Sequence, residues 1–323
     1  MARQAYFEAT GGPEVIRWRD VELPPPGPGE VTVRHTAVGL NYIDTYHRSG
    51  MYPAKLPSGL GSEAAGVVEA VGDGVALAVG QRVGTWGPAL GAYATARNVA
   101  ADQLVTLPDG VPDEVAAAIM LKGATTAFLI EDCAQVQAGQ AVLVHAAAGG
   151  VGHLLVGWLK AIGATVIGVV GSAAKADKVR AAGADHVLRH DVDDLPKRVR
   201  EITNGQGVPV VLDGVGAATW EASLGSAARR GLIVSYGNAG GAVRGVDLGV
   251  LARHGSLFVT RPTLFDYAVT PDAKQAIIDR VFAMLAKGAI VPEIGQRFAL
   301  EDAAGAHRAL EAGETVGSSV LLP

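Results

Sequence analysis

Residues 145–152 read HAAAGGVG, and they stand between an apolar strand-like run, AVLVHA, and a helical run, VGHLLVGWLKAI. Gly149 and Gly150 leave bare backbone N–H groups at the start of the expected helix, where the helix dipole attracts an anion. Gly152 lets the helix pack closely on the sheet, and Ala147 replaces the first glycine, so the match to the dinucleotide fingerprint is A-x-G-x-x-G. The sequence predicts that this turn binds the diphosphate of a dinucleotide through Ala148, Gly149, Gly150 and Val151. A tight turn without a ligand is the alternative.

The next strand-like run, ATVIGVVG, ends at Gly171. Enzymes selective for NAD usually place an Asp or Glu there, which binds the 2′-hydroxyl of the adenosine ribose. Gly171 carries no carboxylate to repel a 2′-phosphate, and Ser172 and Lys175 follow on the first helical turn. The sequence therefore predicts NADPH as the cofactor. In the alternative, Lys175 is an ordinary solvated lysine.

Apolar strands alternate with helical stretches from about Gly123 to Pro262, which indicates parallel βαβ units. We expect a doubly wound parallel sheet with its ligand at the carboxyl ends of the strands. The six strand candidates are AVLVHA, TVIGVV, HVLRH, VVLDGV, LIVSYG and LFVTRP. The chain before this region is made of short β-like runs broken by Gly and Pro, and the chain after it closes with another strand candidate, SSVLLP. The last part is expected to rejoin the first, so that an α/β domain is inserted in a β-rich one.

Composition and charge narrow the expected partners. With 323 residues and 49% hydrophobic content, the chain is long enough for two domains. Its net charge of −5 gives no positive field for nucleic acid or an anionic membrane, so neither is expected as a main partner. Cys133 is the only cysteine, which excludes an intrachain disulfide. Because no secretory signal or membrane-spanning stretch is recognisable, the expected location is the cytoplasm.

The order of segments resembles the zinc-independent quinone oxidoreductases of the medium-chain dehydrogenase/reductase superfamily, which include zeta-crystallin. The resemblance implies a GroES-like β-rich domain formed by residues 1–122 and 263–323, a Rossmann domain at 123–262, and a homodimer joined through the nucleotide domains. It covers nearly the whole chain and rests on NYIDTYHRSGMYP, LPSGLGSEAAGVVEAVG, LKGATTAFL, HAAAGGVG, SYGNAGGAV and VTRP.

The same resemblance implies the remaining site residues. Tyr46 and Tyr52 match tyrosines that the family places beside the bound quinone, where a phenol could also donate a proton to the developing oxygen anion. Packing of both rings into the β-rich core is the alternative. The nicotinamide is expected to face the β-rich domain, and its half of the cofactor site would include Asn41, Thr125, Thr126, Tyr236, Gly237, Asn238, Val259, Thr260 and Arg261.

Zinc-dependent relatives carry a cysteine ligand shortly after the strand that ends here near Gly39, and a histidine in a G-H-E motif. The G-H-E position here reads Gly61, Ser62, Glu63, and a serine hydroxyl cannot replace a neutral imidazole as a strong zinc ligand. We therefore expect no metal in the reaction.

Two positions depart from the bacterial pattern. His190 stands where these relatives often have a Tyr near the adenine phosphate, and Gly313 stands where they often have an Arg. His190, when protonated, and the adjacent Arg189 could still contact the phosphate, but the lost cationic group would weaken discrimination between NADPH and NADH.

These observations predict an NADPH-dependent quinone oxidoreductase that transfers a hydride or electrons without zinc. The first alternative is an NADPH-dependent alkenal or enone double-bond reductase, which needs the same hydride donor and a similar metal-free pocket. The second is a non-enzymatic role, crystallin-like or RNA-binding, against which the acidic balance and the cofactor turn argue. The expected small-molecule partner is a quinone or an electrophilic enone.

Overall fold

The computed structural model describes all of residues 1–323, and the chain divides into two compact units. Unit 1 comprises Met1–Lys122, Val269–Phe282 and Pro292–Pro323. Unit 2 comprises Gly123–Ala268 and Ala283–Val291. The domain boundaries given above, 122/123 and 262/263, stay predictions for the functional domains.

Unit 1 is built on a β structure that joins the two ends of the chain. A seven-stranded sheet has the order β15-β16-β3-β5-β6-β8, with β7 paired to β3, and a second sheet has the order β2-β1-β4. The strands are β1 Ala2–Phe7, β2 Arg17–Val21, β3 Glu30–Leu40, β4 Ser58–Gly59, β5 Glu63–Val71, β6 Arg82–Trp86, β7 Ala96–Ala100, β8 Leu104–Thr106, β15 Ile294–Ala299 and β16 Ser318–Leu322. The closing strand candidate SSVLLP is therefore confirmed as β16, which pairs antiparallel with β3.

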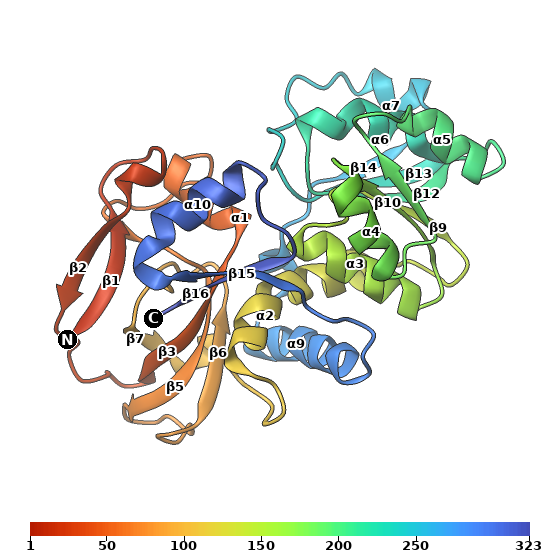
Figure 1. The fold of residues 1–323 in the computed structure, drawn as a ribbon. Helices are drawn as coiled ribbons and strands as arrows, with labels where there is room; N and C mark the ends of the chain where they lie inside the picture. Colours follow the sequence, from red (N-terminus) through yellow and green to blue (C-terminus); the bar gives the residue numbers. More distant parts are fainter. The chain divides into compact units, whose positions relative to one another are not determined.

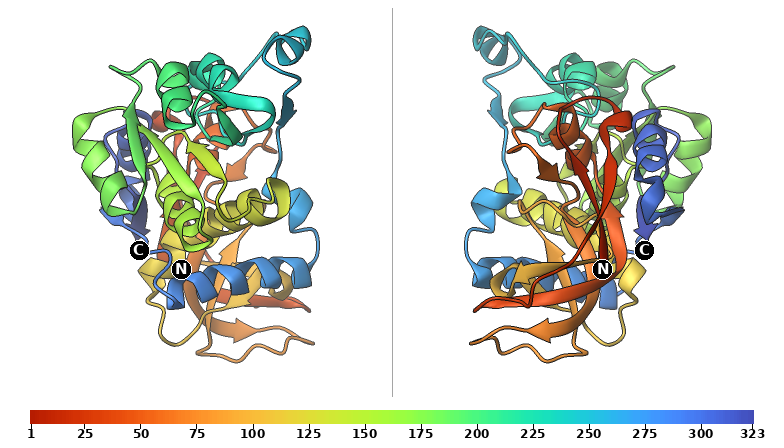
Figure 2. Two further views of the ribbon diagram at one scale, coloured as in Figure 1. Left: turned by 90° about the vertical axis from the view of Figure 1, so that its right-hand side faces the viewer. Right: turned by 90° about the vertical axis from the view of Figure 1, so that its left-hand side faces the viewer.

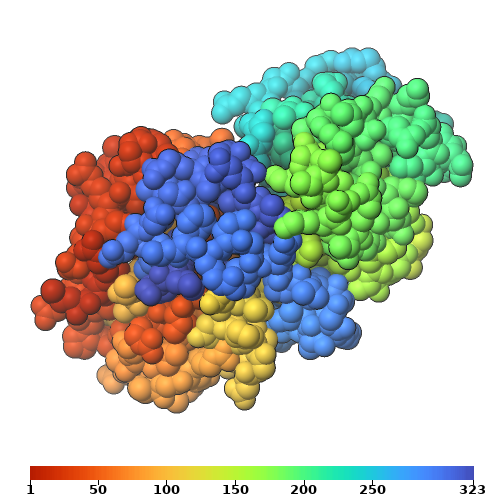
Figure 3. Space-filling view, viewed as in Figure 1, coloured from red at the N-terminus to blue at the C-terminus, as the bar shows by residue number.

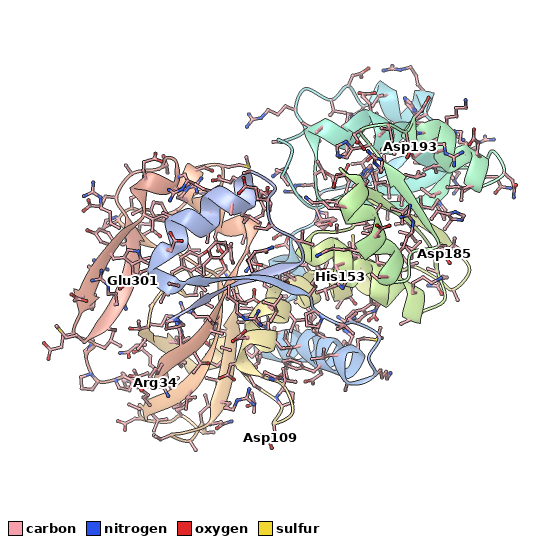
Figure 4. The ribbon with its side chains drawn as sticks, in the orientation of Figure 1. Arg34, Asp109, His153, Asp185, Asp193 and Glu301 are labelled. Carbon is pink, nitrogen blue, oxygen red and sulfur yellow. The ribbon has the colours of Figure 1, made fainter.

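The C-terminal segment also completes the core of unit 1. Helix α10 (Ala303–Glu311) packs near helix α1 (Tyr42–Ser49), and its residues share a buried cluster with Phe7, Leu40 and Tyr93. Both termini lie in this unit (Figures 1 and 2), and blue C-terminal residues lie directly beside the red N-terminal segment in Figure 3. At its surface, Arg3 Nε donates to Glu301 Oε1 over 2.5 Å; Glu301 is labelled in Figure 4.

Unit 2 contains a six-stranded parallel sheet with the order β11-β10-β9-β12-β13-β14. Its strands are β9 Ala141–Val144, β10 Thr165–Val170, β11 His186–Arg189, β12 Val208–Asp213, β13 Ala227–Ser235 and β14 Phe258–Thr260. This order reverses direction between β9 and β12, as a doubly wound sheet requires. The α/β fold predicted from the sequence is confirmed, and the strands run close to the six predicted segments. Five of them end one or two residues before the predicted segment, because the residues that follow already belong to turns; only β10 matches its segment from end to end.

Helices connect these strands as crossovers. Right-handed connections place α3 and α4 on one face of the sheet, and α5 packs with α6 on the other. The helices are α3 Gly150–Ala161, α4 Ala173–Ala181, α5 Leu195–Ile202, α6 Trp220–Ser226, α7 Gly249–Arg253 and α8 Leu264–Tyr267, while α2 Asp113–Ala127 and α9 Pro271–Ala286 contribute residues to both units. None of the helices combines the length and apolar character needed to cross a membrane.

Polar contacts anchor α3 at both ends. His153 Nε2 donates to the Val291 carbonyl over 3.0 Å, and Lys160 Nζ donates to Asp185 Oδ1 over 2.8 Å; His153 and Asp185 are labelled in Figure 4. Asp185 also accepts from Val166 N in β10. The orientation of α3 is therefore set by contacts beyond its apolar face.

Candidate active site

The turn after β9 brings the start of α3 against its own backbone. Gly149 N donates to the Ala146 carbonyl over 2.9 Å, and α3 begins at Gly150. A Cβ at residue 152 would lie 2.2 Å from the Ala146 oxygen, closer than any real Cβ approaches. The sequence predicted a glycine for close packing of the helix on the sheet, whereas the nearest atoms belong to the turn. Gly149 is the N-cap residue of α3 and Gly150 its first residue, so neither position places a side chain over the start of the helix, as an anion site needs.

The residues predicted to bind the 2′-phosphate of NADPH lie together at the carboxyl ends of β10 and β11. Gly171 follows β10, Ser172 is the N-cap residue of α4, and Lys175 lies in the first turn of that helix. His190 N donates to the Val170 carbonyl over 3.1 Å, and a Cβ at residue 171 would lie 2.8 Å from His190 Nε2. An Asp or Glu at position 171 would thus require the exposed His190 ring to move.

Arg189, the cation next to His190, already has a carboxylate partner. Its Nη2 lies 2.5 Å from Asp191 Oδ2, and its backbone N–H donates to Asp193 Oδ2 over 2.7 Å. The charge of Arg189 is therefore balanced within its own turn, which makes it a weaker phosphate ligand than its position suggests.

The predicted residues after β13 also lie at this carboxyl edge. Tyr236 N donates to the Asp213 carbonyl over 2.8 Å, and Gly237 N approaches the same oxygen at 3.4 Å. Arg261 Nη1 donates to the Ser235 carbonyl over 2.7 Å, which ties the end of β14 to the end of β13. Parallel pairing places Val259 and Thr260 beside Ile233 and Val234.

Asn238 follows in the same turn, where its carbonyl accepts from Gly241 N. Thr125 and Thr126, by contrast, lie in the last turn of α2 and not in a turn at the carboxyl edge. Thr126 is fully buried there.

Sequence reasoning missed a buried polar cluster at the centre of this edge. Asp213 Oδ1 accepts from Val215 N and Gly216 N, and its Oδ2 accepts from Ser223 Oγ over 2.7 Å. Because the Ser223 proton goes to Asp213, His145 Nε2 must donate to Ser223 Oγ, 3.1 Å away. The cluster holds the turn after β12. Its only signal in the sequence is a single Asp at the end of the apolar run VVLD.

In unit 1, the two predicted tyrosines lie together. The ring centroids of Tyr46 and Tyr52 are 5.2 Å apart with an interplanar angle of 59°, and Tyr52 N donates to the Tyr46 carbonyl over 3.0 Å. His47 meets the Tyr52 ring edge-on at 5.8 Å, and Tyr46 is 8% exposed. The pair can offer aromatic faces to a planar ligand.

Asn41 is fixed by a buried charge pair that sequence reasoning also missed. Its Nδ2 donates to Glu63 Oε2 over 2.8 Å, and Glu63 Oε1 accepts from Leu121 N over 2.7 Å. Lys122 Nζ lies 3.7 Å from Glu63 Oε2 and donates to the Leu40 carbonyl. Burial raises the pKa of Glu63, and the Lys122 charge opposes that rise. The Asn41 amide is thereby held in one orientation.

The positions at which zinc-dependent relatives carry ligands do not suit zinc here. Ser62 Oγ donates to Asp44 Oδ1 over 3.0 Å, and Asn41 Nδ2 is engaged by Glu63. A serine hydroxyl and a side-chain amide are poor replacements for imidazole and thiolate. The structure also contains no cluster of three or more His, Cys, Asp or Glu side chains arranged as a metal site.

The contact at Gly152 generates a stability prediction. Alanine favours a helix interior over glycine by about 1 kcal/mol, but a collision with backbone outweighs this gain. We expect Gly152→Ala to lower the free energy of unfolding by about 2 kcal/mol, measured by urea denaturation. Gly110→Ala is the control, because a Cβ at Gly110 meets no atom within 4 Å. Equal stability of the two variants would contradict the assigned contact.

Comparisons with known proteins agree with this geometry. Residues 27–109 match the alcohol dehydrogenase GroES-like domain, and residues 150–268 match the zinc-binding dehydrogenase family. A quinone oxidoreductase of Pseudomonas aeruginosa is 52% identical over the full length of both chains. The crystal structure of Escherichia coli quinone oxidoreductase complexed with NADPH is 45% identical, with a TM-score of 0.97 over 99% of this chain and 100% of that one.

A 2-haloacrylate reductase from a Burkholderia species is also similar, with 40% identity over 100% of this chain and 99% of its own. The resemblance stated from the sequence motifs is thus confirmed by relatives that match from end to end. The chain belongs to the quinone oxidoreductase family of the medium-chain dehydrogenase/reductase superfamily.

Proposed function

We propose that the protein is an NADPH-dependent quinone oxidoreductase that transfers a hydride or electrons from NADPH to quinones without zinc. The observation that carries the proposal is the turn from Ala147 to Gly152, whose close contact with Ala146 presents backbone N–H groups at the start of α3. Relatives named quinone oxidoreductases share the full chain length and 45–52% identity, which supports the same activity.

In this proposal unit 2 holds the cofactor. The N–H groups of Ala148, Gly150 and Val151 bind the diphosphate at the positive end of α3. Gly149, whose own N–H donates to the Ala146 carbonyl, leaves room for the diphosphate because it has no side chain. Gly171, Ser172, Lys175 and His190 receive the 2′-phosphate, for which Lys175 supplies the positive charge. Bound NADPH supplies the reducing equivalents, and the carboxyl edge fits it because no side chain fills the turn at Gly152.

Separate groups of residues are proposed to contact the nicotinamide and the quinone. Asn41, Thr125 and Thr126 contact the ring and its ribose, with Asn41 oriented by Glu63. Tyr46 and Tyr52 stack on the quinone, and a tyrosine hydroxyl helps to neutralise the oxygen anion. The turn after β13 and the end of β14 complete this half of the cofactor site through Tyr236, Gly237, Asn238, Val259, Thr260 and Arg261.

We also propose a homodimer joined through the nucleotide-binding units. Edge strand β14 leaves Phe258 57% exposed and Val259 37% exposed, and an edge strand with apolar side chains is suited to pairing with a second copy. The free thiol of Cys133 suits a reducing compartment, and the cytoplasm is the proposed location.

The acceptor class is tested with purified protein, NADPH, and a panel that pairs 1,4-benzoquinone with an enone and 2-chloroacrylate. We expect fast NADPH oxidation with the quinone and at least about tenfold lower kcat/KM with the alkenes. A chelator should leave the rate unchanged.

The 2-haloacrylate reductase relative favours the double-bond reductase as the second candidate, and higher kcat/KM with the alkenes than with the quinone would select it. No oxidation with any acceptor would overturn both.

Cofactor choice is tested with Lys175→Ala. A lysine on a phosphate is worth about 1.4 kcal/mol or more, so kcat/KM for NADPH should fall about tenfold while the value for NADH stays constant. Lys178→Ala, on the same helix, is the matched control. The assignment is wrong if the wild type prefers NADH or if Lys175→Ala lowers both values equally.

The proton-donor role is tested with Tyr52→Phe, which keeps the ring and removes the hydroxyl. We expect kcat for quinone reduction to fall at least about tenfold with KM nearly constant, because the lost group acts in the transition state. Tyr6→Phe, under the Arg19 guanidinium, is the control. An unchanged rate would leave Tyr52 only an aromatic contact with the quinone.

A further inference from the structure

A buried chain of hydrogen bonds in unit 1 connects helix α10 to the start of helix α1. Arg48 Nη1 lies 3.1 Å from His307 Nδ1, His307 Nε2 lies 3.0 Å from the Tyr93 hydroxyl, and that hydroxyl lies 3.0 Å from Asp44 Oδ2. The four residues are at most 2% exposed. We call Arg48, His307, Tyr93 and Asp44 the Arg48 relay. The reaction described above uses none of them.

The direction of this relay follows from what each group can donate. A guanidinium has only donors, so His307 Nδ1 must accept from Arg48. Burial and the Arg48 charge lower the pKa of His307 to about 3, so the ring is neutral and its Nε2 carries the hydrogen. Nε2 then donates to the Tyr93 oxygen, which leaves the Tyr93 hydrogen for Asp44. Each bond points from Arg48 toward Asp44.

This direction gives the relay a positioning role instead of proton conduction. Arg48 does not give up its proton at physiological pH, so a proton at Asp44 has no exit along the relay. The relay instead fastens both ends of α1. Asp44 accepts from Asn41 N over 2.9 Å, while Arg48 donates to the Gly11 carbonyl and forms a 2.6 Å ion pair with Glu311. Helix α1 carries Tyr46, and Asn41 is its N-cap residue.

Asp44 is the member of the relay whose charge can change near neutral pH. Burial raises its pKa to about 7, against the hydrogen bonds donated by Asn41 N, Tyr93 and Ser62. The charged or titratable groups around it are Lys122 on α2, Arg48 on its own helix, Glu63 on β5, His307 on α10 and Tyr93, whose own pKa is raised well above its usual value. The ionised carboxylate accepts all three donors without conflict.

We propose that the Arg48 relay is a positioning device that orients α1, and with it Asn41 and Tyr46, for quinone reduction only while Asp44 is ionised. The inference rests on the proposed function, because Asn41 and Tyr46 are assigned to the site there. Asp44 Oδ2 accepts from Asn41 N and Tyr93, and Oδ1 accepts from Ser62. A proton added to either oxygen therefore forces at least one of these hydrogen bonds to rearrange.

The first test does not depend on activity. The side-chain carboxyl 13C resonance of Asp44, assigned by its loss in Asp44→Asn, is titrated in cofactor-free protein. We expect a midpoint near pH 7 in the wild type and a midpoint about one pH unit higher in Tyr93→Phe, because the lost bond favours the ionised form. Tyr6→Phe should leave the midpoint in place. An unmoved midpoint in Tyr93→Phe would overturn the relay.

Stability supplies a second check of the same titration. The folded protein keeps the Asp44 proton up to about pH 7, whereas the unfolded chain releases it near pH 4. Relative to Asp44→Asn, the free energy of unfolding of the wild type should therefore fall as pH rises from about 4 to about 7. A parallel pH dependence of the two proteins would contradict a raised pKa at Asp44.

The last test is the pH profile of NADPH-dependent quinone reduction. We expect kcat of the wild type to fall as pH drops through about 7. In Tyr93→Phe this fall should begin at a higher pH. In Asp44→Asn it should be absent, and kcat should be lower than in the wild type at high pH. A uniform loss of rate with unmoved limbs would mean that the relay only supports the fold. If the wild type reduces no quinone although the Asp44 carboxyl titrates as expected, the proposed function is wrong, while the hydrogen bonds of the relay are supported.

Discussion

The contact between Gly152 and the Ala146 carbonyl is the constraint on which unit 2 depends. It sets the distance between the end of β9 and the start of α3, and no side chain larger than hydrogen is compatible with it. Because α3 is also tied to Asp185 and Val291, the helix cannot retreat from the turn without breaking other bonds. The proposed anion site is thus a product of packing, and its backbone donors would be oriented before a ligand arrives.

Unit 1 depends on a different kind of constraint, the burial of charge. Glu63 and Asp44 are fully buried, and each would cost several kcal/mol if it were left without partners. Glu63 is satisfied by Asn41, Leu121 and Lys122, and Asp44 by donors from three separate segments. Such directional partners define one position for α1, where apolar packing alone would tolerate several.

Much of the fold could be predicted from the sequence because its signals are local. The alternation of apolar strands and helical runs predicted the doubly wound sheet, and the glycines at 149–152 predicted the strand-to-helix turn after β9. The relay carried no such signal, since Tyr93 and His307 are 214 residues apart and no local pattern links them. Glu63 was visible in the Gly61–Glu63 motif, but the motif was interpreted only for its missing zinc ligand. Its partner Asn41 lies 22 residues away on another element.

The pairing of β16 with β3 has a consequence for how the chain is made. Ser319 is the partner of Leu40, so the sheet of unit 1 cannot close until β16 has left the ribosome. The strands of unit 2, from β9 to β14, are all synthesised before β16, while the edge of β3 that pairs with β16 is still open. Nascent chains must therefore keep that edge from pairing with the wrong partner for most of translation. A chain that stops just before β16 would have every strand of the α/β sheet but lack the strand that pairs with β3.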